Sequence, residues 1–188
     1  MLYRAYVVPT HYSLVGLACL LQQQFEVGHL KILVCLPTSE HVIYYSRLFF
    51  SILEVPCLGL HPWLTDTQAS AVRKRFASGA TTAQVLFWHD SSYRGLDFPG
   101  VHTVVIIGHP GSTLDYIHRV GRTGRRGEAG TSVLLLHPFE RAIVLQKLQP
   151  LGLQVAGDSV LAKPELLTKY LRLIDKQLFQ ACMCGLDS

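Results

Sequence analysis

Four short apolar runs constrain the fold of this chain more than any other feature. They cover residues 31–36, 85–88, 104–107 and 132–136. These runs lack the alternation of polar and apolar residues that marks a strand with one solvated face, so each predicts a strand buried on both faces. Segments with helical periodicity separate them, which is typical of a parallel sheet covered by helices. The sequence therefore predicts an α/β fold with a doubly wound, mostly parallel sheet and helices on both faces.

Further strands and the helices are expected around these runs. Shorter strands are predicted at 3–8 and 57–60, and helices at 13–25, 40–53, 66–76 and 138–148. Ser13 and Asp66 are the predicted N-caps of the first and third helices. Residues 150–152 break the pattern, 155–158 are predicted to form a loop, and an amphipathic helix follows at 164–181. This predicts a domain of residues 1–150 and an extension, 151–188, whose helix packs back on the domain; a partner-binding arm is the alternative.

Composition restricts the class of protein. Apolar residues make up 49% of the chain and charged residues 16%, which predicts a globular domain and not a disordered one. The apolar stretch 14–21 is too short to span a bilayer, so no membrane is expected as a partner. The five cysteines are unevenly spaced, which favours free thiols in a reducing, intracellular compartment, with cytoplasm, nucleus and mitochondrion left open. Cys182-Met-Cys184 lacks a second ligand pair, so no metal site is expected.

Two polar segments follow the second and third of the buried runs. The first reads Asp90-Ser-Ser-Tyr-Arg94-Gly95-Leu-Asp97, and the second reads His118-Arg119-Val-Gly121-Arg122-Thr-Gly-Arg125. Arginines three residues apart predict one face of a short helix. Guanidinium groups are planar forks that suit phosphate oxygens. Because ligands bind at the carboxyl ends of strands in such folds, a phosphate-facing site is expected there.

The two segments together resemble the fifth and sixth conserved motifs of DEAD-box RNA helicases, with residues 94–97 and 118–125 carrying the resemblance. It implies the C-terminal RecA-like domain of such an enzyme, over roughly residues 1–150. It also implies that Arg122 and Arg125 are catalytic arginine fingers. Four further residues are implied on the nucleotide side: Asp97 at the ribose hydroxyls, His118 and Arg119 in coupling two domains, and Arg94. The implied cofactor is ATP with Mg²⁺, both held mainly by an N-terminal RecA-like domain.

The resemblance also implies RNA as a partner. The residues assigned to it are Thr38, Asp90, Gly95 and Gly121. Thr38 and Ser39 begin a predicted helix, where they either contact phosphate or merely cap the helix. Asp66 and Ala69 stand where the family pattern expects Gln and Arg on the RNA-facing side. No aromatic platform for stacking on bases is evident, so only weak backbone binding is expected.

Two functions remain open from the sequence. Neither a Gly-x-x-x-x-Gly-Lys-Ser/Thr phosphate loop nor an Asp-Glu-Ala-Asp box occurs in the 188 residues. The first function is therefore a helicase domain that gives arginine fingers and part of an RNA surface to an N-terminal ATP-binding domain. The alternative is a structural or assembly factor in a ribonucleoprotein, without turnover.

Overall fold

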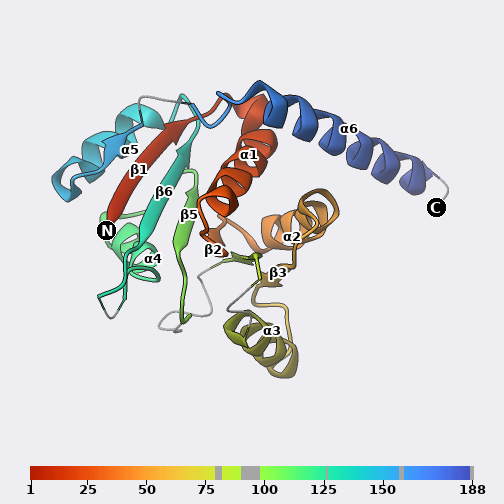
Figure 1. The fold of residues 1–188 in the computed structure, drawn as a ribbon, viewed down its shortest axis with the longest axis horizontal. Coiled ribbons are helices and arrows are strands. Elements are labelled where there is room, and N and C mark those ends of the chain that lie inside the picture. Colours follow the sequence, from red (N-terminus) through yellow and green to blue (C-terminus); the bar gives the residue numbers. More distant parts are fainter. Residues whose placement is uncertain (79–81, 90–97, 126, 157–158, 187–188) are drawn as a thin grey trace.

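The sheet is the centre of the molecule. A computed structural model describes residues 1–78, 82–89, 98–125, 127–156 and 159–186. These residues form a seven-stranded, wholly parallel sheet in the order β3-β4-β2-β5-β6-β1-β7 (Figure 1). The strands are β1 (Leu2–Val7), β2 (Lys31–Cys35), β3 (Cys57–Leu60), β4 (Gln84–Trp88), β5 (Thr103–Ile107), β6 (Thr131–Leu136) and β7 (Gln154–Val155). Every residue of β2 and β4 is buried, as their unbroken apolar sequences predict.

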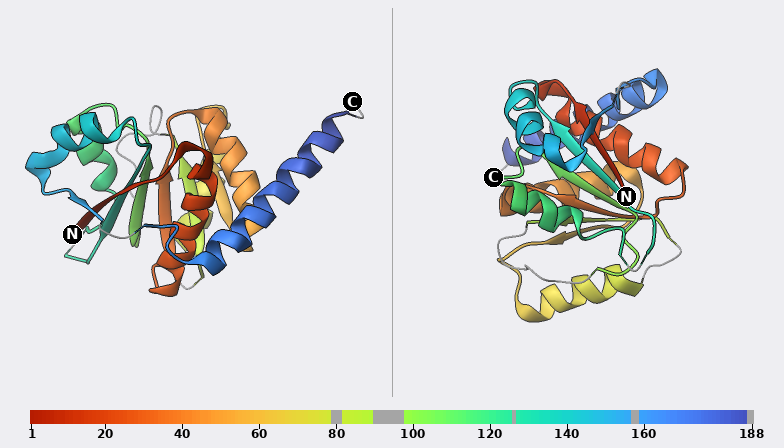
Figure 2. Two further views of the ribbon diagram at one scale, coloured as in Figure 1. Left: turned by 90° about the horizontal axis from the view of Figure 1, so that it is seen from above. Right: turned by 90° about the vertical axis from the view of Figure 1, so that its left-hand side faces the viewer.

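Helices cover both faces of the sheet, and the predicted doubly wound α/β class is confirmed. They are α1 (Ser13–Glu26), α2 (Ser39–Leu53), α3 (Asp66–Ser78), α4 (Thr113–Val120), α5 (Arg141–Leu148) and α6 (Pro164–Leu186), with single 3-10 turns at η1 (Thr10–Tyr12) and η3 (Gln149–Leu151). One core cluster joins the sheet to α1, α2 and α6, and a second joins it to α3, α4 and α5. Figure 2 shows α1 and α3 on opposite sides of the strands. Within the described residues, no helix is both long and apolar enough to cross a bilayer.

The predicted helix caps are partly wrong. The hydroxyl of Ser13 donates to the carbonyl of Thr10 and leaves α1 without a side-chain cap. Asp66 is the first residue of α3, and Thr65 caps that helix instead. The Thr65 hydroxyl accepts from the Gln68 amide at 3.2 Å, while the Gln68 side chain accepts from the Thr65 amide at 2.9 Å. This reciprocal pair is a capping box, and its signature Thr-x-x-Gln was readable in the sequence.

Helix α5 begins at Arg141, three residues later than predicted. The Glu140 carboxylate accepts hydrogen bonds from the amides of His137 at 2.9 Å and His109 at 2.8 Å. The Glu140 amide in turn bonds to the carbonyl of His137 at 3.0 Å. These bonds hold the chain after β6 in a turn, so the helix can start only after Glu140.

Strand β7 replaces the predicted start of a loop at 155. Its two residues pair with β1, Arg4 with Gln154 and Ala5 with Val155. A strand of two exposed residues carries no periodicity and is selected by the free edge of β1. The sheet therefore includes residues on both sides of the predicted domain boundary at 150.

The first half of α6 lies against α1. Leu166, Tyr170 and Ile174 are buried, and the Tyr170 hydroxyl donates to the Gln22 side chain at 2.9 Å. Farther along, Gln177, Leu178 and Ala181 line a pocket together with residues of α2, and the end of the helix projects beyond the domain (Figure 2). Phe179, on this half, is 67% exposed. The buried half of the helix is thus held chiefly by apolar packing around one tyrosine.

Replacing Tyr170 by alanine is expected to lower the free energy of unfolding by about 3–5 kcal/mol, as for other large buried aromatic residues. Tyr170→Phe removes only the hydrogen bond to Gln22 and is expected to cost about 1 kcal/mol. Urea denaturation followed by circular dichroism measures both values. Phe179→Ala, on the exposed part of the same helix, is the control and should change stability by about 0.5 kcal/mol or less. Equal losses for Tyr170→Ala and Phe179→Ala would contradict the packing described.

Three cysteines lie in or beside the core. Cys19 and Cys35 are buried, Cys57 is half-buried, and all three are free thiols. Burial raises the pKa of Cys19 to about 11 and that of Cys57 to about 12. Their thiolate forms are therefore scarce at neutral pH, which makes them unreactive packing residues.

Two histidines stack at the amino edge of the sheet. The rings of His29 and His102 lie 5.9 Å apart and nearly parallel. His29 Nδ1 is 2.9 Å from both the Gln24 amide oxygen and the Thr103 hydroxyl. The pKa of His29 is lowered, first by burial and then by repulsion from His102.

Acidification below about pH 6.5 is therefore expected to destabilise the protein. The unfolded chain binds a proton at His29 more readily than the folded one, so stability rises with pH between the lowered folded pKa and the ordinary value near 6.5. The free energy of unfolding measured from pH 7.5 to 5 checks this. His29→Gln should reduce that slope. A slope that is unchanged in His29→Gln would refute the assignment.

Candidate functional site

The segment 121–125, which we name the arginine turn, carries three of the predicted site residues: Gly121, Arg122 and Arg125. Helix α4 ends at Val120, with Gly121 as its C-cap, so only Arg119 of the three arginines is helical. The amides of Arg122 and Thr123 bond to carbonyls three residues earlier, and Gly124 has a φ of +64°. The prediction of one arginine-bearing helical face is therefore wrong, because the glycines at 121 and 124 turn the chain out of the helix.

The arginine turn is anchored to the amino edge of the sheet. The buried Thr123 hydroxyl lies 2.6 Å from the carbonyl oxygen of Val101 and 3.0 Å from that of His102, just before β5. Gly130, just before β6, passes so close that a Cβ there would lie 2.5 Å from the Gly124 amide nitrogen. The backbone of the arginine turn thus lies at the amino edge, because α4 returns the chain there, whereas the Arg122 side chain reaches Trp88, the last residue of β4.

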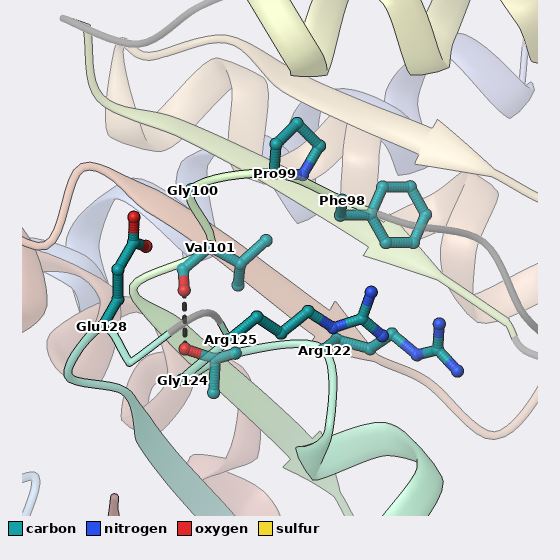
Figure 3. Close-up of a pocket in the computed structure, with 9 residues that line it drawn as sticks. Phe98, Pro99, Gly100, Val101, Arg122, Gly124, Arg125 and Glu128 are labelled. Carbon is teal, nitrogen blue, oxygen red and sulfur yellow. Dashed lines mark hydrogen bonds between the residues drawn. The ribbon is translucent and has the colours of Figure 1, made fainter.

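The arginine side chains nevertheless extend back along the sheet. Figure 3 shows Arg122 and Arg125 pointing the same way, in the direction of the neighbouring strands, past Phe98 and away from Glu128. Arg125 Nε donates to the Gly121 carbonyl at 2.7 Å, and Arg122 Nε to the His118 carbonyl at 3.2 Å. These bonds fix the stem of each guanidinium and direct both groups to one region.

Trp88, predicted only as part of a strand, lies under one of the arginines. The Arg122 guanidinium carbon is 6.0 Å from the centre of the Trp88 ring, within the range of a cation–π contact. Trp88 is 2% exposed and packs edge-on against Phe98 at 5.9 Å. A pocket of about 90 Å³ opens beside the turn and is lined by Phe98, Pro99, Gly100, Val101, Arg122, Thr123, Gly124, Arg125 and Glu128. Trp88 and Thr123 thus belong to the site, although neither was predicted as a site residue. Thr123 could have been found from its place within the motif 118–125, whereas Trp88 had no such signal in the sequence.

The other predicted residues of the second segment are His118 and Arg119, which precede the turn, and Gly121, which begins it. His118 is exposed on α4 and Arg119 is half-buried. Gly121 is exposed, and its amide donates to the carbonyl of Ile117 at 2.9 Å. A Cβ at Gly121 would approach that same carbonyl to 3.2 Å, so the glycine permits a tight helix end. These three residues form the surface of the domain next to the arginine pair.

Four predicted site residues lie outside the described residues: Asp90, Arg94, Gly95 and Asp97. The described chain before them ends at His89 and after them resumes at Phe98. His89 follows β4 at the carboxyl edge, whereas Phe98 is buried beside Trp88 on the face that holds Arg122. His89 therefore lies at the carboxyl edge of the sheet, and Phe98 lies beside the arginine pair.

Thr38 lies at the carboxyl edge, well away from the arginine turn in the sheet. Its hydroxyl accepts from the His41 amide at 3.3 Å and lies 2.9 Å from His41 Nδ1, so it caps α2. A hydrogen bond with the same hydroxyl is the main reason why the pKa of the exposed Glu40 is lowered. Ser39 is buried and follows the cap. Of the two residues predicted to begin this helix, Thr38 is therefore the one that caps it.

The two positions where the family pattern expects RNA contacts differ in exposure. Asp66 is exposed on the first turn of α3, whereas Ala69 is only 1% exposed and packs in the core under that helix. The expectation that both residues face RNA is wrong for Ala69. An arginine placed there would have to push its stem out of a close-packed layer.

Comparison with known proteins agrees with this architecture. Residues 17–127 match the family model of the helicase conserved C-terminal domain. Over 142 residues the chain is 37% identical to the human protein "Probable ATP-dependent RNA helicase DDX10". The aligned region covers 71% of this chain and 16% of that protein. It is also 35% identical over 128 residues to the "ATP-dependent rRNA helicase RRP3" of Meyerozyma guilliermondii, covering 68% of this chain and 26% of the relative. The chain belongs to the DEAD-box RNA helicases.

Within that family, the chain is a C-terminal RecA-like domain. Its fold matches the structure titled "Mss116p DEAD-box helicase domain 2 bound to an RNA duplex" with a TM-score of 0.67, 25% identity, and coverage of 88% of this chain and 68% of the other. A second match, Mss116 bound to single-stranded RNA and UDP-BeF, has a TM-score of 0.71 at 25% identity and covers 89% of this chain and 35% of that one. The chain thus spans only a minor part of the length of the curated relatives it matches.

Proposed function

We propose that this DEAD-box domain works as the second RecA-like domain of an ATP-dependent RNA helicase and supplies Arg122 and Arg125 as arginine fingers. The observation that carries the proposal is the common direction of the two guanidiniums, which leave one anchored turn beside an open pocket. Phosphoryl transfer is accelerated mainly by positioning and by neutralising charge as the phosphoryl group leaves. Two fixed guanidiniums at a domain surface suit that role, provided that another domain holds the nucleotide.

The pocket beside the turn is suited to the terminal phosphate of a nucleotide and not to the whole nucleotide. Its lining offers two arginines and the backbone of Gly124 but no phosphate loop, and Glu128 points away from the guanidiniums (Figure 3). ATP with Mg²⁺ would therefore be held mainly by an N-terminal RecA-like domain, and the bound nucleotide would supply the phosphoryl group to be transferred. On the nucleotide side, Asp97 would bind the ribose and Arg94 would be a further contact. His118 and Arg119 would couple the two domains when they close.

RNA is the proposed partner at the carboxyl edge of the sheet. Thr38 lies there at the N-terminus of α2, where backbone amides favour anions. Asp90 and Gly95 belong to the segment that follows β4, and that strand ends at the same edge. Gly121 begins the arginine turn at the amino edge, so it would be a separate RNA contact, made when the two domains close.

The isolated chain is expected to hydrolyse no ATP above background, with or without RNA, because its arginines have no bound nucleotide to act on. Release of inorganic phosphate by the purified chain measures this. An Arg122→Ala variant purified in parallel is the control for contaminating ATPases. Turnover that persists through further purification and disappears in that variant would contradict the proposal that a separate N-terminal domain must bind the ATP.

One observation favours the alternative, an assembly factor of a ribonucleoprotein without turnover. Asp66 places an exposed carboxylate, and Ala69 a buried methyl group, where the family pattern has RNA-contacting side chains. A carboxylate repels phosphate, which weakens any grip needed for unwinding. ATP turnover by the full-length protein, measured with and without RNA, distinguishes the two functions. Stimulation by RNA supports the helicase, and its absence supports the assembly factor.

A further inference from the structure

An exposed tryptophan lies at the carboxyl edge of the sheet, in the short segment between β3 and α3. Trp63 is 61% exposed, unlike the buried Trp88. The segment around it is held by several hydrogen bonds: the Leu64 amide to the His61 carbonyl at 3.2 Å, and the capping box of Thr65 and Gln68. A large aromatic surface on a rigid turn loses little conformational entropy on binding, so it is suited to hold a flat partner.

The neighbours of Trp63 connect it to the proposed RNA edge. The His61 ring contacts the indole edge-on, with centres 6.1 Å apart and planes at 77°. The His89 amide bonds to the Leu60 carbonyl at 3.3 Å, at the end of β3, and His89 Nδ1 lies 3.2 Å from the Leu36 carbonyl, beyond the end of β2. The loop that carries Trp63 and the loop that carries Thr38 therefore flank His89 on one edge.

The surroundings of Trp63 distinguish a nucleic acid base from a protein as the partner. Residues 65–68, which follow it closely in the chain, are all exposed and polar. A protein hot spot is normally enclosed by further apolar contacts that exclude water, and these are lacking among residues 65–68. The nearby carboxylate of Asp66 disfavours a phosphate at this point but not an uncharged base.

We propose that Trp63 stacks on an unpaired base of single-stranded RNA that crosses the carboxyl edge of the sheet. This inference rests on the proposed RNA-binding function and adds a base contact, which the sequence alone did not suggest. Stacking compensates for the contacts that Asp66 and Ala69 do not provide. Because purines present a larger aromatic face, adenosine runs are expected to bind more tightly than uridine runs.

The test is a titration of the chain with labelled ten-nucleotide RNAs, oligo(A) and oligo(U), at several salt concentrations. Trp63→Ala is expected to weaken oligo(A) binding by roughly five- to 150-fold, the range for stacking of one base on one aromatic side chain. Trp63→Phe should recover most of the affinity. The slope of log affinity against log salt should stay the same in Trp63→Ala, because no phosphate contact is removed. Binding of an abasic oligonucleotide should not differ between Trp63→Ala and the unmodified chain.

Phe139→Ala is the matched control, because Phe139 is 72% exposed, follows β6 at the same edge and stacks on His137. It should leave oligo(A) affinity unchanged. RNA binding that is equally strong in Trp63→Ala would overturn the stacking and assign the exposed indole to a protein partner. Equal weakening of abasic and ordinary RNA would also overturn it, by showing a structural role. If the unmodified chain binds no RNA, both this inference and the RNA part of the proposed function fail.

Discussion

Replacing Arg122 or Arg125 by alanine is expected to lower RNA-stimulated ATP turnover by roughly a thousandfold or more in the two-domain protein that the proposed function requires. The reason is that the guanidiniums, fixed by bonds from Nε to the carbonyls of His118 and Gly121, oppose charge that develops as the γ-phosphate leaves. Nucleotide affinity should change far less than turnover. Steady-state hydrolysis, together with fluorescent-nucleotide titration, measures both quantities.

Arg141→Ala is a suitable control for these variants. Arg141 is exposed on α5, so its removal changes the net charge equally without touching the arginine turn. Arg122→Lys separates charge from geometry, because lysine keeps the charge but lacks the planar fork. Loss of nucleotide binding with an unchanged turnover rate in either alanine variant would show that these residues are binding groups and not fingers.

Gly130→Ala is expected to damage the same reaction without altering any charged residue. An added Cβ would lie 2.5 Å from the Gly124 amide nitrogen and 2.6 Å from the Thr123 hydroxyl oxygen, so the arginine turn must move. Overpacking of this kind costs about 1–3 kcal/mol of stability. A displacement of about 1 Å at a catalytic group can cost about a hundredfold in rate. We therefore expect both effects in one variant, measured by urea denaturation and by ATP turnover of the full-length protein.

Gly127→Ala distinguishes steric contact from backbone strain. Gly127 has a φ of +83°, but among the described residues, its two chain neighbours aside, no atom lies within 4 Å of the Cβ that alanine would add. The free energy of unfolding of this variant should fall by about 1 kcal/mol, because alanine is strained in the left-handed backbone conformation, and most of the ATP turnover should remain. Equal loss of turnover in the two glycine variants would mean that the close approach of Gly130 does not position the arginines.

The strands and the class of fold were predictable because their causes are local. An unbroken apolar run such as β2 or β4 can be satisfied only by burial on both faces, and that requirement is written in consecutive residues. The same holds for the family, whose motif from His118 to Arg125 is contiguous in sequence. Even the missed cap of α3 had a local signal in Thr65 and Gln68.

Other features depend on partners distant in the sequence, and only the tertiary structure decided them. The two residues of β7 form a strand because β1 offers a free edge, and α5 starts late because Glu140 is held by the amide of His109. The spacing of the arginines predicted Arg122 on a helix. In the structure Arg122 lies in a turn, and Gly124 in that turn is in close contact with Gly130 at the amino edge of the sheet. Exposure is likewise a property of the packed domain: Ala69 is buried on the core-facing side of α3, whereas Trp63, six residues earlier in the chain, is exposed. Sequence thus determined the sheet and the family, because burial and motif are encoded in neighbouring residues. The direction of the arginines and the exposure of Trp63 arose only when segments far apart in the chain came into contact.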